Sequence, residues 1–231
     1  MDERAVLAML QLADSGFPSG AYTLSGGLET LVEEGIVRGA EDVAGCLRSM
    51  LLGRSARGDL AALVAAHRAA AGDPPDGEAI VVIDRSLDAT KLAAEERVGA
   101  RRVGRRIALE AERLTGSAIV HQFSEAIAAA TTPGTAAVAT GIAAVAMGIP
   151  EHEAALAAGH ASALAFLTVA VRLGRIGHGD QQRLLREAGE TIIHAVDIAQ
   201  ATDARTFRPF APGLDIAMAR HETAPGRLFA S

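Results

Sequence analysis

The apolar residues of this chain recur at the three- and four-residue spacing of helix faces along most of its length. Leu28, Leu31 and Val32 show this spacing within residues 25–35. Strands would need alternating β-branched and aromatic residues, and that pattern is nearly missing. The pattern therefore predicts an all-α fold. We expect about nine or ten helices, covering residues 4–13, 25–35, 40–71 as a pair, 79–88, 90–114, 117–130, 135–147, 151–174, 181–202 and part of 214–231.

Two of these helices carry apolar faces that we expect to point into the core. In the first helix, Val6, Leu7 and Leu10 lie together with Met9 on one side. In the helix over 151–174, one stripe contains Leu156, His160, Leu164, Leu167 and Val171. A histidine on such a stripe is usually a buried residue with a hydrogen-bond partner, so we expect His160 in the core.

The composition fits a bundle of closely spaced helices. Alanine is abundant, aromatic residues make up 3% of the chain and tryptophan is absent. Alanine is the best helix former, and its small side chain lets helices approach closely. We expect one helical domain over residues 1–211, followed by a tail over 212–231 that binds a partner and is partly flexible. Leu228, Phe229 and nearby charged residues could order against a partner, or the tail could pack back on its own domain.

Charge and cysteine content narrow the class of protein. The net charge of −6 argues against bulk attraction to nucleic acid or to an anionic membrane. The lone Cys46 excludes an intrachain disulfide and a metal cage of several thiolates. The uncharged stretches 126–150 and 154–171 are rich in alanine, so we interpret them as buried bundle helices and not as membrane spans.

The sequence lacks the common motifs of catalysis and nucleotide binding. It has no G-x-x-x-x-G-K-[ST], no G-x-S-x-G, no C-x-x-C and no H-E-x-x-H. The run Glu151–His152–Glu153 is either a weak site for a divalent ion or an acidic first turn that complements the helix dipole. A helical-bundle enzyme that uses His160 or Glu29 in a cavity is an alternative, but it would need a second titratable group close by.

Residues 95–113 form a helix rich in arginine. Arg97, Arg101 and Arg105 share one side, with Arg102 and Arg106 beside them. The spacing also predicts an ion pair between Arg106 and Glu110. Because aromatic residues for base stacking are missing, we expect a solvated or partner-facing helix and no nucleic-acid site.

The segment DSGFPSGAYTLSGGLE, residues 14–29, combines one proline with four glycines. It could bind an anion on free backbone N–H groups, or it could turn the chain sharply and let two helices pack closely. We favour the turn. We expect Ser25 to be the N-cap of the next helix and Glu29 to reach outward.

Three separated segments resemble one known family. MLQLADSGFPSGAYTLSGGLE, residues 9–29, is similar to a segment of the urease accessory protein UreF. AVRLGRIGHGDQQRLL, residues 170–185, and PGLDIAMARHETAPGRLFAS, residues 212–231, are similar to two further UreF segments in the same order. A weaker similarity covers ERVGARRVG, residues 96–104, where Ala100 stands in place of the usual serine. The resemblance extends over essentially the whole chain.

The resemblance implies a cytoplasmic, all-α accessory protein for the maturation of urease by nickel incorporation. Its partners would be the accessory proteins UreD (also called UreH) and UreG, together with apo-urease, and members of the family commonly form homodimers. UreG is a GTPase that brings nickel. The chain itself would be no enzyme and would bind no cofactor firmly, because the partner complex handles nickel and GTP. It would bridge its partners and regulate the GTPase.

On this interpretation we expect ten residues to contact or position partners. They are Pro18, Tyr22, Ser25 and Glu29 in the first segment, Arg172 and Gln182 in the second, and His221, Glu222, Arg227 and Phe229 in the third. The tail residues would meet UreD. An alternative is a direct nickel-binding metallochaperone that uses Glu151–Glu153 and His221.

Overall fold

A computed structural model describes residues 2–14, 16–18, 25–204, 206–224 and 228–229. These residues form helices and no strand, which confirms the predicted all-α fold. The helices are α1 (Glu3–Ala13), α2 (Leu28–Glu33), α3 (Ala40–Ser49), the π-helix η2 (Met50–Ser55), α4 (Asp59–Ala70), α5 (Gly77–Thr90), α6 (Ala94–Thr115), α7 (Ala118–Ala128), α8 (Ala136–Ala146), α9 (Glu151–Arg172), α10 (His178–Glu187), α11 (Gly189–Ala201) and α12 (Pro212–His221).

The structure contains more helical segments than the expected nine or ten. The single helix expected over 181–202 is divided at Ala188 into α10 and α11. In the pair expected over 40–71, α3 continues directly into η2, and the break comes at residues 56–58. The other predicted helices are found within a few residues of their expected ends, because glycine and proline mark most of the breaks.

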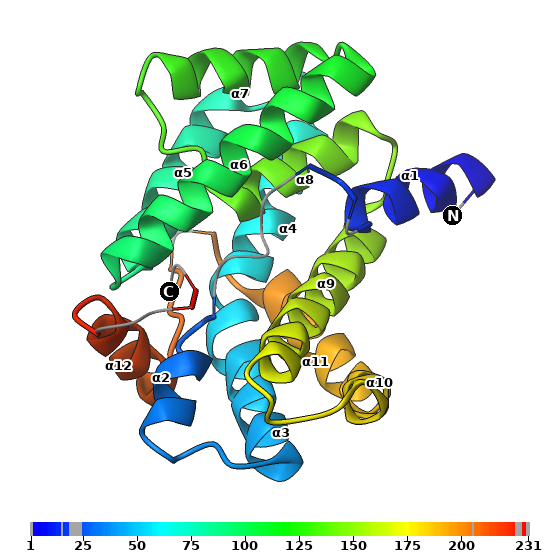
Figure 1. Cartoon of the computed structure of the whole chain (residues 1–231). Helices are drawn as coiled ribbons and strands as arrows, with labels where there is room; N and C mark the ends of the chain where they lie inside the picture. The colour runs from blue at the N-terminus through cyan, green and yellow to red at the C-terminus, as the bar shows by residue number, and fades with distance from the viewer. Residues whose placement is uncertain (1, 15, 19–24, 205, 225–227, 230–231) are drawn as a thin grey trace.

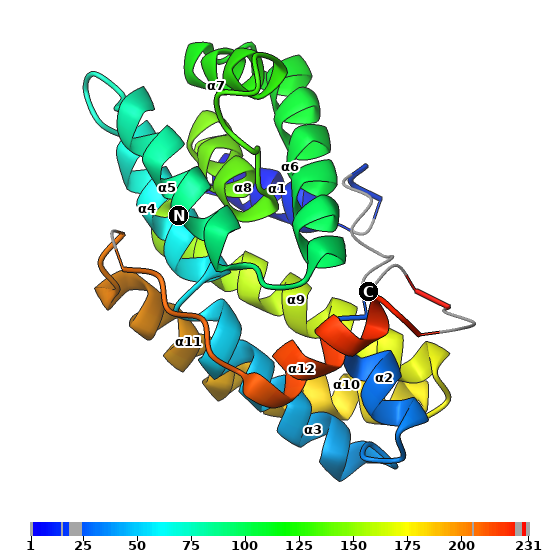
Figure 2. The same ribbon diagram turned by 90° about the vertical axis from the view of Figure 1, so that its left-hand side faces the viewer.

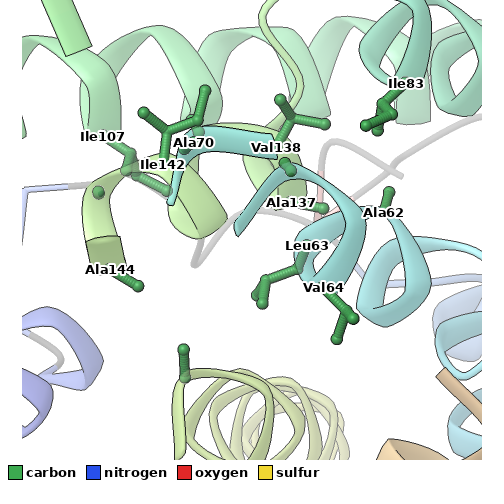
Figure 3. Close-up of a cluster of buried hydrophobic side chains, with 14 of the residues drawn as sticks. Ala62, Leu63, Val64, Ala70, Ile83, Ile107, Ala137, Val138, Ile142 and Ala144 are labelled. Carbon is green, nitrogen blue, oxygen red and sulfur yellow. The ribbon is translucent and has the colours of Figure 1, made fainter. Parts of the chain in front are cut away.

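The helices enclose two apolar cores. The first core is formed by α4 to α8 together with α11, and the second by α2, α3, α9, α10 and α12. Figure 1 shows α5 to α8 gathered at one end and α2, α3, α10 and α12 at the other, with α4 and α9 running between them. Figure 3 shows side chains of the first core, among them Leu63 and Val64 of α4 and Val138 and Ile142 of α8.

Backbone contact between helices distinguishes the first core. A Cβ atom at Gly104 of α6 would lie 2.2 Å from the carbonyl oxygen of Gly134, just before α8. A Cβ atom at Gly141 of α8 would lie 2.4 Å from the carbonyl oxygen of Leu63 in α4. Real Cβ atoms cannot come this close, so these positions require glycine. The small side chains thus bring α6 and α4 against the two sides of α8.

A buried carboxylate fixes the beginning of α8. Asp84 of α5 is 0% exposed and accepts four hydrogen bonds of 2.5–2.8 Å. The donors are the hydroxyls of Thr132 and Thr135 and the backbone N–H groups of Gly134 and Thr135. Thr135, the N-cap residue, makes no side-chain cap, and Asp84 of a distant helix instead holds the two residues that precede α8.

The predicted core face of α9 is confirmed at Leu167, which is 0% exposed, but it is wrong at His160, which is exposed. A Cβ atom at Gly159 would lie 2.9 Å from Cγ2 of Ile192 in α11, so α9 approaches α11 through its smallest residue. Most of the buried residues of α9 are small; they are Ala154, Ala155, Gly159, Ala163, Phe166, Leu167, Val169 and Ala170.

The predicted core face of α1 is wrong at two residues. Leu7 and Leu10 are 67% and 58% exposed, whereas Ala5 is buried. Helix α1 lies beside α9, and Met9 and Leu12 line a groove of about 290 Å³ between the two helices and the first core. Leu7 and Leu10 therefore face outward, and Met9 is the predicted residue that packs against the first core.

Helix α9 is the one helix among the described residues that is long and apolar enough to cross a membrane, and 44% of its most apolar stretch is buried. It packs against α1, α3, α4, α10 and α11 within the bundle. These contacts account for its apolar composition, in line with the expectation of a bundle helix.

The chain after α11 runs back across η2 before it forms α12. The N–H of Phe210 donates to the carbonyl of Gly53 over 2.8 Å, and the N–H of Arg208 donates to the carbonyl of Arg57 over 3.1 Å. A Cβ atom at Gly53 would lie 2.3 Å from the carbonyl oxygen of Phe210. Glycine at position 53 thus allows this segment to place α12 beside α2 (Figure 2).

Candidate partner-binding site

The turn before α2 is built by two glycines with left-handed backbone. Gly26 and Gly27 have φ angles of 61° and 84°, and Gly27 is the N-cap residue of α2. A Cβ atom at Gly27 would lie 2.9 Å from the carbonyl oxygen of Leu214, so this turn also packs closely against α12. The expectation of a sharp turn with close helix packing is therefore confirmed for the described part of the segment.

The prediction that Ser25 caps α2 is wrong. Two left-handed residues separate Ser25 from Leu28, the first residue of the helix, and no side chain caps α2. Ser25 is 1% exposed, and its hydroxyl has no hydrogen-bond partner among the described residues. Its carbonyl accepts a hydrogen bond from the N–H of Leu28 and so closes the turn.

Glu29 is the centre of the candidate site, and the prediction that it reaches outward is wrong. Its residue exposure is 1%. The carboxylate accepts from the backbone N–H of Leu228 over 2.7 Å and from that of Phe229 over 3.2 Å. It also lies 2.9 Å from Nε2 of His221. A buried carboxylate needs several partners to compensate for lost hydration, and all three described here come from the C-terminal segment.

His221 connects Glu29 to a second carboxylate. The imidazole is 0% exposed, and its Nδ1 lies 2.9 Å from a carboxylate oxygen of Glu95 in α6. A neutral imidazole has a single N–H, so two carboxylate acceptors require a doubly protonated ring or a proton on one carboxyl group. The side chains of Glu29, His221 and Glu95 thus form a closed cluster that joins α2, α12 and α6. We call this cluster, with the backbone of Leu228 and Phe229, the Glu29 junction.

Two further tail contacts surround the Glu29 junction. The guanidinium carbon of Arg172, at the end of α9, lies 4.6 Å from the ring centroid of Phe229, which is the geometry of a cation–π contact. The carboxylate of Glu222 accepts from the N–H of Ala94, the first residue of α6. A negative charge at this position complements the helix dipole of α6. Both contacts hold the tail against the bundle.

A network of ion pairs lies beside the junction. Lys91 is 5% exposed, and its ammonium contacts Asp59 over 2.9 Å and Glu96 over 3.0 Å. Arg54 of η2 pairs with Glu96 and with Asp215 of α12. Because Glu95 belongs to the junction and Glu96 to this network, the beginning of α6 contributes to both.

The pKa values in this network follow from burial and pairing. Burial alone would lower the pKa of Lys91, but the carboxylates of Asp59 and Glu96 outweigh burial and raise it to about 12. Burial alone would raise the pKa of Asp59, yet the Lys91 ammonium holds that pKa below its usual range. Lys91 and Asp59 therefore stay charged at neutral pH. Asp215 anchors α12 to η2 through its ion pair with Arg54.

The structure does not bring every predicted site residue to the junction. Pro18 is exposed beside Glu110 and Leu114 of α6. Glu110 is 15 residues from Glu95, so Pro18 lies roughly 22 Å along α6 from the junction. Gln182 is exposed on α10, whereas its neighbour Gln181 is buried and donates to Thr168. Tyr22 and Arg227 lie outside the described residues.

The two alternative sites are not assembled among the described residues. The carboxylate of Glu151 is held by Arg68 and Gln200, and His152 faces Gln200 at 3.2 Å. In the described part of the chain, no group of three or more His, Cys, Asp or Glu residues could hold a metal ion. His221 is enclosed in the Glu29 junction, and the exposed His160 has no place in a buried enzyme cavity.

Sequence reasoning missed Glu95, Arg54 and Asp215 as parts of this region. Glu95 lies 126 residues from His221, and Arg54 lies 161 residues from Asp215. Local spacing carries no signal for contacts over such separations. The arginine-rich helix predicted over residues 95–113 and the weak similarity at residues 96–104 both lie at Glu95, but neither indicated a contact with His221.

Comparison with known proteins assigns the family. The UreF family model matches residues 37–189. The urease accessory protein UreF of Yersinia enterocolitica (serotype O:8 / biotype 1B) is 31% identical over 231 residues, which cover all of both chains. The proteins of the same name from Yersinia pseudotuberculosis (serotype IB) and Yersinia pestis (strain Pestoides F) are 31% and 30% identical with the same coverage. The chain therefore belongs to the UreF family of urease accessory proteins, a family of accessory proteins and not of enzymes.

Proposed function

We propose that this chain acts in the maturation of urease by nickel incorporation, as a scaffold and chaperone without catalytic activity. It bridges UreD (UreH) and UreG on apo-urease and regulates the GTPase activity of UreG. It works in the cytoplasm as a homodimer. UreG supplies the GTP site, since this sequence has no phosphate loop. Nickel is cargo of the complex.

One observation carries the proposal. The Glu29 junction and the Arg172–Phe229 contact beside it unite the three segments by which the sequence resembles UreF, although these segments lie far apart in the chain. Glu29 comes from the first segment, Arg172 from the second, and His221 and Phe229 from the third. Most of these side chains contact one another rather than solvent. They therefore act by positioning the tail for a partner.

The exposed residues of this region supply the partner contacts. Leu228 is 73% exposed although its backbone N–H is held by Glu29, and Ile216 of α12 is 52% exposed. Apolar side chains on an anchored backbone lose little conformational entropy when a partner covers them. The junction thus presents apolar contacts to UreD in a fixed arrangement.

Binding and activation assays with two pairs of variants test the proposal. Leu228→Asp alters an exposed apolar contact, and Val82→Asp changes an exposed apolar residue on α5 as its control. Glu29→Ala removes the junction, and Glu33→Ala removes an exposed carboxylate of the same helix. Each variant is co-purified with UreD and UreG and assayed for activation of apo-urease.

We expect Leu228→Asp and Glu29→Ala to lose at least 10-fold in UreD binding and in urease activation, with both controls unchanged. Circular dichroism and thermal unfolding of Leu228→Asp should match those of the wild type, which separates loss of contact from loss of fold. If Leu228→Asp and Glu29→Ala still assemble and activate urease fully, the assignment of this region as the partner-binding site is contradicted. A wild-type chain that does not assemble with UreD and UreG would contradict the function itself.

A further inference from the structure

Helix α6 has an outward face that takes no part in the Glu29 junction. Its buried residues, including Val103 and Ile107, pack toward the first core. On the opposite side, Val98, Arg102, Arg105 and Leu109 follow one another at helical spacing, and all are exposed. Figures 1 and 2 show α6 on the outside of the bundle. At 1.5 Å per residue, this α6 face from Val98 to Leu109 is roughly 16 Å long.

Two arginines at the α6 face have no acceptor among the described residues. Arg105 and the neighbouring Arg106 are exposed and make no hydrogen bond or ion pair in that part of the chain. Elsewhere on the helix, Arg97 donates to backbone carbonyls and Arg101 pairs with Asp88. With no acceptor in the described ranges, the guanidinium groups of Arg105 and Arg106 are available to another molecule.

The carboxylates of α6 are already engaged elsewhere. The ion pair expected between Arg106 and Glu110 is not formed, because Glu110 pairs with Arg113 over 3.0 Å. Glu112 lies 2.7 Å from His121 of α7, and this pairing holds the pKa of Glu112 below its usual range. The α6 face is therefore locally positive on a chain whose net charge is −6.

Apolar residues at both ends of the α6 face indicate the kind of partner. Val98 is 66% exposed and Leu109 is 39% exposed, with the arginines between them. Arginine among apolar side chains is typical of protein interfaces, where the guanidinium pairs with carboxylates in two-pronged geometry. Nucleic acid would also need aromatic side chains for stacking, and this face has none.

We propose that the α6 face docks an acidic segment of a protein partner. Its carboxylates pair with Arg105 and Arg106, and its apolar side chains cover Val98 and Leu109. A partner helix of about three turns matches the length of the face. The inference rests on the proposed function, because the proteins used to test it are the partners named there.

The test compares two double charge reversals in the full chain. Arg105→Glu with Arg106→Glu inverts the α6 face. Arg48→Glu with Arg186→Glu is the control, because both residues are exposed on α3 and α10 and make no ion pair among the described residues. Each protein is titrated with purified UreD, UreG and apo-urease at 0.1 M and 0.5 M NaCl, and with transfer RNA and anionic lipid vesicles.

We expect the α6 variant to bind one of the three proteins roughly 10- to 100-fold more weakly at 0.1 M NaCl, with a smaller difference at 0.5 M because salt screens exposed charges. The control variant should bind like the wild type, and both should unfold at the wild-type temperature. Equal affinity of wild type and α6 variant for every protein would overturn the docking proposal alone. So would a loss confined to transfer RNA or vesicles. If the wild type binds none of the proteins, the proposed function fails as well.

Discussion

The first core and the Glu29 junction both exclude water, but they do so by different means. In the first core, alanine and glycine bring helix backbones into contact, as at Gly104 and Gly141. In the junction, the carboxylate of Glu29 is shielded by His221 and by backbone N–H groups from residues about 200 positions away. A closely packed core is destabilised by an added atom, whereas a buried charge cluster is destabilised by the loss of a single partner.

The largest expected effect comes from adding one methyl group to the first core. Gly104→Ala places a Cβ atom against the backbone of Gly134 and Thr135, which cannot move aside as a side chain can. We expect a loss of about 3 kcal/mol or more in the free energy of unfolding, measured by urea titration. Gly45→Ala is the control, since nothing lies within 4 Å of its Cβ position on α3. The control should be neutral or stabilised by up to about 1 kcal/mol. Equal stability of the two variants would refute backbone contact at Gly104.

The next largest effect comes from removing the carboxylate of the Glu29 junction. Glu29→Ala leaves His221 and two backbone N–H groups without their acceptor. We expect the unfolding free energy to fall by about 2–4 kcal/mol and hydrogen exchange in α12 to accelerate. Glu33→Ala, an exposed change on the same helix, should stay within about 0.5 kcal/mol of the wild type. Unchanged exchange in α12 after Glu29→Ala would show that the junction does not hold the tail.

A smaller effect concerns the cation–π contact beside the junction. Arg172→Ala removes the guanidinium group from the Phe229 ring but leaves the hydrogen bonds of Glu29 in place. We expect the free energy of unfolding to fall by about 0.5–1 kcal/mol. Hydrogen exchange should become faster at the N–H of Phe229 and stay unchanged in the first core. Arg172→Lys should retain part of the effect. Faster exchange in the first core would argue that the two regions are coupled.

The smallest effect is a pH dependence in the network of Lys91. The pKa of Asp59 is lowered in the folded chain, so its stabilising effect is present above the usual aspartate pKa and is lost as pH falls through the lowered value. The side chain is 42% exposed, so screening by water keeps the effect below about 1 kcal/mol. The stability difference between wild type and Asp59→Asn should shrink from pH 6 to pH 2. A constant difference would exclude a stabilising charge on Asp59.

The sequence contained enough information to predict the helices but not their packing. Glycine and proline mark most helix ends, so the all-α class and most helix positions were predictable. The buried faces of α1 and α9 were predicted only in part, because Leu167 is buried and Met9 packs against the core, but Leu7, Leu10 and His160 are exposed. In these helices, Ala5 and Gly159 form the closer contacts, since helices approach most closely where side chains are smallest.

The candidate site was predictable only in part. The resemblance to UreF identified Glu29, Arg172, His221 and Phe229, which the structure brings together. It did not reveal that Glu29 is buried. The partner residue Glu95 also stayed hidden, because contacts across more than a hundred residues leave no periodic pattern in the sequence.

The sequence separation within the Glu29 junction has a consequence for synthesis. The partners of Glu29 are added 192 to 200 residues after it. At about 5–20 residues per second, a ribosome takes on the order of 10 to 40 seconds to deliver them. Until then, the Glu29 carboxylate is hydrated by water, because these partners have not yet been synthesised. A nascent chain that stops before His221 lacks all three partners and keeps a hydrated Glu29, so the complete junction forms only after translation through Phe229.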